Sequence, residues 1–348
     1  MEKDSIEVSY HELPLDYKRS KIKIVKRFRL RNTLYKQIIS NTKDREVDNT
    51  IFMVTSPPTI YTPILNPLSK KYCTLLDLRD TYQEWEYHPF LKRRIEKWEQ
   101  CSAMRHAESI TYAHENFRPY IIKDGINPSK LHFVTNGANS KIFTFKGKRK
   151  TLSDANLNLI YAGGILHYHD FPKWIEVMRY LQKENADVHL TIIGTGNDSK
   201  RVESKIKAYH LSNITFYNEK IDQKELADYI RGADYALASI NSNLTFFYNV
   251  NILTKIFEAL SCGVPFLSFA GDATDVFSRQ FNLCKNWRTK DEFNFEKISQ
   301  TIANLPSPTI SQRQTISKRA HAIFSFKIIA SKFKKILEQS LRNYIKTK

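Results

Sequence analysis

The sequence predicts an α/β protein made of two domains, each built on a parallel sheet, that face each other across a cleft. Short apolar runs alternate with amphipathic stretches along the chain, which is the pattern of β-α-β units. A polar, basic stretch without periodicity at 145–158 interrupts this alternation, which then begins again. At 348 residues the chain is also long for a single core, so two domains are expected.

The N-terminal half is expected to hold four strands and one clear helix. Apolar runs that end in turn or polar residues predict strands at 49–58, 72–80, 108–115 and 130–137. Helical periodicity predicts a helix over 93–107. These elements define a first domain at 1–146.

The C-terminal half repeats the same order of elements. The pattern predicts strands at 157–164, 187–196, 213–219 and 235–240. It predicts helices at 171–185, 201–211, 222–234 and 253–262. Asp222 followed by Glu225 is a capping-box signature at the start of the third of these helices. We therefore place a second domain at 147–325, and a long basic amphipathic helix at 326–348 that packs back toward the first domain.

The composition is basic, which favours some classes of binding partner over others. The chain has 54 Lys and Arg against 36 Asp and Glu, a net charge of +18. Such a charge favours polyanions, which include nucleic acids, anionic lipids and phosphorylated small molecules. A protein that is merely basic and soluble is the competing interpretation.

Cysteine usage and hydropathy indicate the compartment. None of the four cysteines has metal or redox spacing, which favours a reducing cytosol. The first residues lack the apolar core of a signal peptide, and no apolar run reaches about 18 residues, the length that spans a bilayer.

Two glycine turns follow predicted strands of the second domain. Gly163 and Gly164 follow one strand, and Gly194 and Gly196 follow the next. Backbone N–H groups at such turns can face a phosphate, although a simple tight turn is the commoner reason for the glycines. The chain has neither a P-loop nor a GxGxxG fingerprint at these positions. His169, in the loop after the first turn, is either a solvated histidine or a phosphate contact.

The stretch TKIFEALSCGVPFLSF at 254–269 places Glu258 on a helix that ends in a Gly-Val-Pro turn before a strand. A carboxylate accepts two hydrogen bonds from adjacent hydroxyls, such as those of a ribose. Lys255, three residues earlier, lies on nearly the same helical face. An intrahelical ion pair between these two residues is therefore the alternative to a ligand site.

These motifs in this order resemble the donor half of retaining glycosyltransferases of family 4, which have the GT-B fold of two Rossmann-like domains. In the first half, VTSPP at 54–58, LLDLRDTYQEW at 75–85 and LHFVTNGANSKIF at 131–143 resemble a branch of that family. This branch contains bacterial transferases that act on N-acetyl-fucosamine and related amino sugars. The resemblance covers about residues 50–340.

The resemblance implies a donor site for a nucleotide sugar. Glu258 would bind the ribose hydroxyls, the first glycine pair would approach the diphosphate, and the second pair would shape the nucleotide pocket. The full set of donor-side positions is Gly163, Gly164, His169, Gly194, Gly196, Lys220, Ile221, Lys255 and Glu258. Lys220 and Ile221 would lie beside the base.

The resemblance also implies an acceptor side in the first domain. Arg79 and Asp80 occupy the place of a catalytic His-Asp pair of the relatives, and Ser56 would lie near the acceptor. No DxD motif for a divalent ion is present, so the site is expected to need no metal.

The sequence departs from the family pattern at several positions. Val250 stands where relatives often have a first glutamate, and Leu253 where they have a proline. The Arg and Lys that clamp the diphosphate in relatives correspond to positions near Gly164 and His169. The first Gly-rich strand of the acceptor domain has no clear counterpart, so we expect a domain that is shortened at its start.

Taken together, these features predict a transferase that moves a hexosamine or deoxy-amino sugar. The donor would be a UDP-sugar and no other cofactor is expected; the acceptor would be a lipid-linked glycan or a growing surface polysaccharide of the capsule or O-antigen type. Basic residues alternate with apolar ones at 18–31, which predicts a patch for anionic lipid formed by Lys21, Lys23, Arg27 and Arg29. The protein would then lie at the inner face of a bacterial membrane.

Two other functions remain open at this level. A GT-B scaffold with impaired catalysis would explain Val250 and the short start. A nucleic-acid-binding protein would explain the charge, although the chain has no RNP, KH or zinc pattern.

Overall fold

The computed structural model describes residues 24–42, 47–147, 150–288 and 294–347. The chain forms two compact units, residues 1–45 and 46–348. In the first unit, the described backbone forms helix α1 (Ile24–Asn41). The predicted lipid patch falls on this unit, with Lys21 and Lys23 outside the described residues. Arg27 and Arg29 lie on α1, where the backbone alone is described.

The second unit contains two parallel sheets. The first has the order β1-β2-β3-β4 and consists of β1 (Ile51–Ser56), β2 (Cys73–Leu78), β3 (Ser109–Tyr112) and β4 (Leu131–Phe133). All residues of β2 and β3 are buried, as expected for central strands of a parallel sheet. The α-helices of this half are α2 (Leu65–Leu68), α3 (Phe90–His106) and α4 (Arg118–Lys123).

The second sheet has the order β7-β6-β5-β8-β9-β10. Its strands are β5 (Leu157–Ala162), β6 (Val188–Ile193), β7 (Ile214–Tyr217), β8 (Tyr235–Ser239), β9 (Phe266–Phe269) and β10 (Lys285–Trp287). Its helices are α5 (Pro172–Lys183), α6 (Ser199–Ala208), α7 (Gln223–Gly232), α8 (Thr245–Val250), α9 (Thr254–Ser261), α10 (Asp272–Ser278), α11 (Phe295–Ala303) and α12 (Ile310–Phe324). This is the doubly wound order of a Rossmann-like sheet, in which the connections reverse direction between β5 and β8.

Short 3-10 helices occupy several connections. They are Val47–Asn49, Thr59–Ile64, Tyr82–Glu84, Glu115–Phe117, Pro128–Lys130 and His167–His169. The segment at Tyr82–Glu84 begins after Thr81, whose N–H donates a hydrogen bond of 2.6 Å to the carboxylate of Glu84, while the N–H of Glu84 donates to the carbonyl of Thr81 at 3.0 Å.

The predicted alternation of strands and helices is confirmed in both halves. Asp222 caps α7 as expected, and its carboxylate accepts a hydrogen bond of 2.7 Å from the N–H of Lys224. The short helix α8 was not predicted, because its six residues give too short a pattern for helical periodicity to be recognised.

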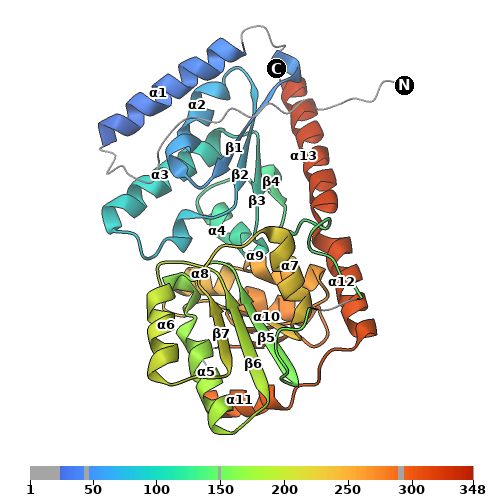
Figure 1. The fold of residues 1–348 in the computed structure, drawn as a ribbon. Coiled ribbons are helices and arrows are strands. Elements are labelled where there is room, and N and C mark those ends of the chain that lie inside the picture. The colour runs from blue at the N-terminus through green and yellow to red at the C-terminus, as the bar shows by residue number, and fades with distance from the viewer. Residues whose placement is uncertain (1–23, 43–46, 148–149, 289–293, 348) are drawn as a thin grey trace. The chain divides into compact units, whose positions relative to one another are not determined.

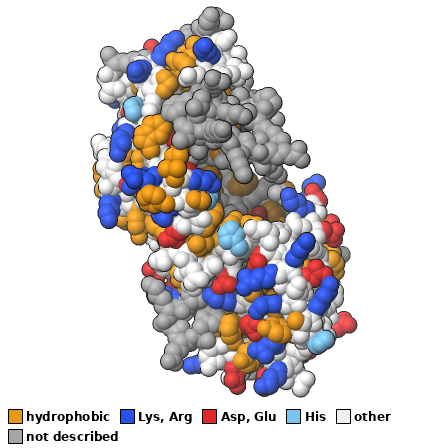
Figure 2. Space-filling model, turned by 90° about the vertical axis from the view of Figure 1, so that its left-hand side faces the viewer, with side chains coloured by type: hydrophobic (Ala, Val, Ile, Leu, Met, Phe, Trp, Pro, Cys, Tyr) orange, Lys and Arg blue, Asp and Glu red, His pale blue; other side chains and the backbone are white. Residues whose placement is uncertain are grey.

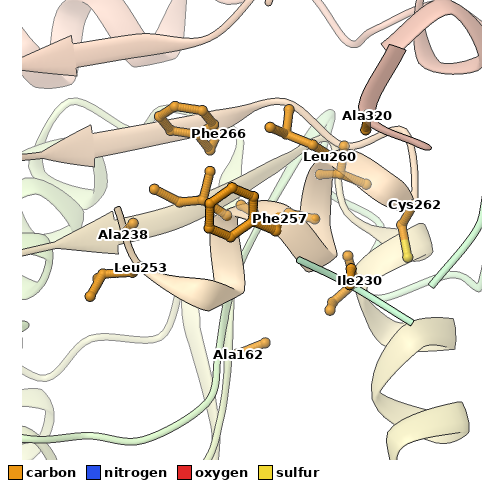
Figure 3. Close-up of a cluster of buried hydrophobic side chains, with 14 of the residues drawn as sticks. Ala162, Ile230, Ala238, Leu253, Phe257, Leu260, Cys262, Phe266 and Ala320 are labelled. Atoms are coloured by element: carbon orange, nitrogen blue, oxygen red, sulfur yellow. The ribbon is translucent and has the colours of Figure 1, made fainter. Parts of the chain in front are cut away.

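The core of the second sheet fixes the position of α9. Ile256, Phe257, Ala259 and Leu260 are all buried on this helix, and Figure 3 shows Phe257 and Leu260 among the side chains of the cluster. The helix ends at Ser261 and is followed by the turn at Gly263, whose φ of 77° favours glycine and where an added Cβ would lie 2.5 Å from a backbone oxygen. Packing and turn together hold the face that carries Lys255 and Glu258.

Helix α13 (Phe326–Thr347) follows α12 and runs along the first sheet (Figure 1). Ile336 packs with Leu75 of β2, and the hydroxyls of Ser340 and Ser109 are 2.5 Å apart. The chain therefore crosses from the second-sheet half back to the first-sheet half. Among the helices of the described residues, none is long and apolar enough to cross a membrane.

Candidate active site

A cavity of about 360 Å³ opens at the carboxyl ends of both sheets. One wall is formed by the turn after β5 and by the segment that enters α9. The other wall is formed by the loops after β2, β3 and β4. Since β5 and β8 adjoin without being consecutive, the cavity lies at the switch point where open α/β sheets bind ligands.

Lys255, in the first turn of α9, carries a buried amine in this cavity. Its Nζ lies 3.6 Å from the ring centroid of Tyr161, and it has no hydrogen-bond partner. A Cβ placed on Gly163 would lie 3.8 Å from this Nζ, so the amine adjoins the glycine turn. Burial lowers the pKa of Lys255 to about 7. An anion at this point would supply the acceptor that the amine lacks.

Glu258 lies one turn further along α9 and also lines the cavity. Burial raises the pKa of Glu258 to about 7, which the nearby Lys255 partly opposes. Because Nζ of Lys255 has no hydrogen-bond partner, the intrahelical ion pair between the two side chains is not formed. Both residues therefore have free polar atoms to offer to a ligand at the cavity.

The glycine turn after β5 is held open by hydrogen bonds to its own backbone. Gly163 has a φ of 120°, and the carbonyl oxygen of Gly164 accepts bonds from the Tyr161 hydroxyl (2.8 Å) and from Nδ1 of His169 (2.9 Å). A carbonyl can only accept, so Nδ1 of His169 carries a proton. Burial lowers the pKa of His169 well below its usual range, and Lys255 adds to this effect. His169 lines the cavity as a neutral imidazole that fixes the turn.

The second glycine pair, in the turn after β6, supports the cavity wall and does not line the cavity. Gly194 and Gly196 are outside the cavity lining. A Cβ on Gly194 would lie 1.9 Å from the backbone oxygen of Gly163, and a Cβ on Gly196 would lie 1.9 Å from that of Ile165. Their lack of side chains lets the turn after β6 support the turn after β5.

Lys220 and Ile221 are also outside the lining. Lys220 is exposed, and Ile221 packs partly against the core of the second-sheet half. Their predicted place beside a base stays a prediction.

Three further residues were predicted at the acceptor side. Asp80 lines the cavity, and burial raises its pKa to about 6. Arg79 does not line it, because its guanidinium forms a two-point ion pair with Asp77, at 2.7 and 2.8 Å. Ser56 is fully buried, and its hydroxyl accepts a bond of 2.9 Å from Gln100. The structure thus brings Asp80, but not Arg79 or Ser56, to the cavity that holds Lys255 and Glu258.

Several lining residues were missed from the sequence. His114 follows β3 and is 4% exposed; burial lowers its pKa to about 3, so its imidazole is neutral. Asn136 follows β4 in the Asn-Gly turn. A polar residue near the carboxyl end of each predicted strand is the signal that could have found both.

Glu84 is the other polar residue that was missed. It is fully buried, and its carboxylate accepts hydrogen bonds from the N–H of Thr81 (2.6 Å) and from the amide of Asn251. Burial and the neighbouring Asp80 raise the pKa of Glu84 well above its usual range. The Thr-x-x-Glu spacing of the capping box was a readable signal for this position.

Aromatic rings border the cavity. The rings of Tyr87 and Tyr168, which come from opposite walls, are nearly parallel with centroids 6.2 Å apart. Phe247 contacts Tyr168 edge to face at 5.3 Å. Such a border offers apolar faces beside the polar groups of the site.

The described residues contain no cluster of three or more His, Cys, Asp or Glu side chains that could hold a metal ion. The predicted independence from metal ions stays a prediction.

The comparisons with known proteins agree with this architecture. The model of the family "Glycosyl transferases group 1" matches residues 144–305, which include the second sheet and α9. No curated protein sequence matches the chain significantly.

Solved structures share the fold. Sucrose-phosphate synthase from Thermosynechococcus elongatus has a TM-score of 0.70 and is 15% identical, over 92% of this chain and 80% of its own. HepE from Anabaena, in complex with UDP and glucose, has a TM-score of 0.66 and is 11% identical, over 88% of this chain and 82% of its own. The apo form of the lipopolysaccharide outer core galactosyltransferase WaaB has a TM-score of 0.63 and is 13% identical, over 92% of this chain and 82% of its own.

The predicted GT-B fold, with two Rossmann-like α/β domains, is therefore confirmed. Together, the family match and this fold support a GT-B glycosyltransferase. The resemblance to the amino-sugar branch stays a prediction.

Proposed function

We propose that the protein transfers a sugar from a UDP-sugar to a glycan acceptor at this cavity. The observation that carries the proposal is the buried, unpartnered amine of Lys255 beside Gly163. The diphosphate would lie at this amine and at the N–H groups of the glycine turn. Glu258, one turn along α9, would accept hydrogen bonds from the ribose hydroxyls.

The choice of UDP is supported by structural likeness. HepE has the same fold and was solved with UDP and with UDP-glucose. The transferred sugar would be a hexosamine or deoxy-amino sugar, as the resemblance to the amino-sugar branch implies.

The chemistry would be retaining and independent of divalent metal. Negative charge develops on the leaving diphosphate, and preorganised donors at that position lower the barrier. Lys255, the backbone of the glycine turn and the N-terminus of α9 provide such donors in this chain. Asp80 faces the same cavity and would accept a hydrogen bond from the attacking hydroxyl.

The acceptor would be a lipid-linked glycan or a growing capsule or O-antigen polysaccharide. The wall that holds Asp80, His114 and Asn136 offers hydrogen-bonding groups for sugar hydroxyls. The rings of Tyr87 and Tyr168 offer apolar faces for a pyranose beside them.

We further propose that the protein associates with the inner face of a bacterial membrane through Lys21, Lys23, Arg27 and Arg29. The support is the alternation of cations and apolar residues in the sequence at 18–31. Figure 2 shows Lys and Arg side chains spread over the face drawn and interspersed with acidic and hydrophobic ones. On the described part of this face, the basic side chains therefore form no continuous band.

A scaffold with impaired catalysis is the second candidate, and Val250 favours it. This residue is 3% exposed and belongs to the hydrophobic cluster of the first-sheet half. A glutamate at this position, as in many relatives, would not fit that environment. The site would then bind the donor without efficient transfer.

A thermal-shift screen with UDP-, GDP- and CMP-sugars tests the donor site, because a ligand that binds only the folded state raises its stability. We expect stabilisation by UDP-sugars and little by the others. Absence of stabilisation by all three would overturn the proposal. Stabilisation by UDP-sugars without sugar transfer would favour the scaffold.

A further inference from the structure

Helix α8 belongs in sequence to the second-sheet half but packs against the first-sheet half. Val250, at its end, lies in the hydrophobic cluster that contains Trp85 and Phe117. The ring of Phe246, at its start, is nearly parallel to that of Phe117 at 6.2 Å and contacts Tyr120 edge to face at 4.7 Å. Both ends of α8 are therefore packed against the first-sheet half, and the connection to α9 begins from this packed helix.

Two carboxylates of the first-sheet half accept hydrogen bonds from the two ends of α8. Glu86 accepts a hydrogen bond of 3.0 Å from the N–H of Phe246 at the start of α8. Glu84 accepts one from the side-chain amide of Asn251, directly after α8. Glu84 is 1% exposed and its other oxygen is bonded to Thr81, so its carboxylate has one fixed orientation.

Asn251 begins the three-residue connection from α8 to α9. It is 5% exposed, and its carbonyl accepts a hydrogen bond of 2.9 Å from Thr274. Lys255 follows four residues later in the first turn of α9. Asn251 is thus held on both its side chain and its carbonyl at the start of the connection that leads to Lys255.

We propose that Glu84 is a positioning residue, which holds Asn251 so that the donor wall with Lys255 faces the loop with Asp80. On one side, its bond to Thr81 fixes the turn directly after Asp80. On the other side, its bond to Asn251 fixes the connection into α9. One buried carboxylate therefore sets the spacing of the two walls of the cavity. The consequence for catalysis rests on the proposed function, whereas the positioning itself does not.

The hydrogen bond between Glu84 and Asn251 can be tested by exchanging the carboxylate and the amide between the two positions. In Glu84→Gln the amide of Asn251 can rotate and accept from the new amide, so the single change keeps a bond. Asn251→Asp places two carboxylates against each other in a buried place. In the double variant E84Q/N251D, the glutamine donates to the new carboxylate and still accepts from Thr81 through its oxygen.

Amide hydrogen exchange on the nucleotide-free protein tests the positioning. We expect Glu84→Ala, Asn251→Ala and Asn251→Asp to speed exchange over 251–258 by at least about tenfold, with the remaining core unchanged. E84Q/N251D should restore the slow exchange. Glu86→Ala, which removes the neighbouring bond to α8, is the matched control and should leave 251–258 unchanged.

Binding of UDP, measured by calorimetry, gives the second readout. We expect Glu84→Ala and Asn251→Ala each to weaken binding about tenfold, and the double alanine variant to weaken it no further, since the two side chains act as one unit. Equal effects of Glu84→Ala and Glu86→Ala would show general docking of α8 and overturn the proposal, as would failure of the swap to restore slow exchange. If the wild-type protein binds no UDP, the proposed function is overturned. The hydrogen-exchange data on the nucleotide-free protein would still show whether Glu84 positions Asn251.

Discussion

The amine of Lys255 lies over the ring of Tyr161, with Nζ 3.6 Å from the ring centroid and no hydrogen-bond acceptor. The face of an aromatic ring attracts a cation, but by only about 0.5–2 kcal/mol. This contact offsets part of the cost of removing an ammonium from water and leaves its N–H groups unsatisfied. A site that keeps such a group is less stable when empty than when an anion occupies it.

Replacing Lys255 by Met should therefore have opposite effects on stability and binding. The free energy of unfolding without nucleotide should rise by about 1 kcal/mol, because a buried unpaired cation is removed. The affinity for UDP should fall by about tenfold or more, because the diphosphate loses its cation. Denaturant unfolding and calorimetry measure the two quantities.

Lys150 provides the matched control for this change. Its Nζ also lies over a tyrosine ring, 3.3 Å from the centroid of Tyr229, but the residue is exposed. K150M should alter neither unfolding nor UDP affinity appreciably. Loss of stability in K255M would mean that the amine has a structural role, and unchanged UDP affinity would place the diphosphate elsewhere.

Glu258 should contribute to nucleotide affinity through the ribose. Glu258→Ala should weaken UDP binding by about 1–3 kcal/mol, the usual loss for a hydrogen bond to a charged group, while the fold survives. Calorimetry with UDP and with 2′-deoxy-UDP separates the contributions. The deoxy nucleotide should bind wild-type protein more weakly, and the variant should no longer distinguish the two. A glutamate of the same half that lies outside the cavity lining, Glu203, is the control.

The affinity for UDP should fall as pH rises from 7 to 9. The pKa of Lys255 is about 7 in the free protein, so the amine loses its proton across this range. A bound diphosphate favours the charged amine, so binding takes up a proton and the association constant falls by up to about tenfold per pH unit. The second ionisation of a phosphate, near pH 6, is largely complete at pH 7. Glu258, whose pKa is about 7, is half ionised at pH 7 and mostly ionised from pH 8, so the slope between pH 8 and 9 reports Lys255.

Calorimetry in two buffers of different ionisation enthalpy counts the protons taken up. K255M should show no fall in affinity between pH 8 and 9. Removing Lys255 raises the pKa of Glu258, but ionisation of that carboxylate would strengthen its hydrogen bonds to the ribose and would not weaken binding. A slope that persists in K255M would assign the proton to another group of the cavity.

Local patterns predicted much of the fold and one wall of the site. The glycine turn after β5 and the helix with Glu258 are short stretches whose spacing can be read directly, and both lie at the cavity. The opposite wall could not be assembled in this way, because Glu84 meets Asn251 across 167 positions of the chain. Arg79 was misplaced for a local reason, because Asp77, two residues earlier on β2, pairs with the guanidinium and keeps it from the cavity lining.

Membrane association is testable with vesicles. The prediction is motivated by the basic residues that alternate with apolar ones at 18–31 and by the net charge of +18 of the chain. The protein should sediment with vesicles that contain anionic lipid and not with neutral ones. Binding should weaken as salt rises, since the Debye length falls from about 10 Å at 0.1 M to about 3 Å at 1 M.

Replacing Lys21, Lys23, Arg27 and Arg29 together by Gln should remove most vesicle binding and leave UDP affinity intact. Four exposed lysines elsewhere, Lys200, Lys207, Lys224 and Lys318, provide a control of equal charge. Equal binding to neutral and anionic vesicles would contradict the electrostatic account. Tighter binding to RNA than to vesicles would favour the nucleic-acid alternative.

The buried environment of Val250 determines whether a glutamate, which relatives often have at this position, can be introduced there. Its side chain is 3% exposed within the cluster that contains Trp85 and Phe117, so it faces the first-sheet half. Val250→Glu would bury a carboxylate among apolar side chains, one residue before the Asn251 that bonds Glu84, and it should cost several kcal/mol of unfolding free energy. Val250→Ile keeps the apolar character and should cost far less. Denaturant unfolding compares the two variants. A V250E protein with wild-type stability and faster sugar transfer would instead show that the position faces the donor, and that the packing of α8 seen here is not the state that reacts.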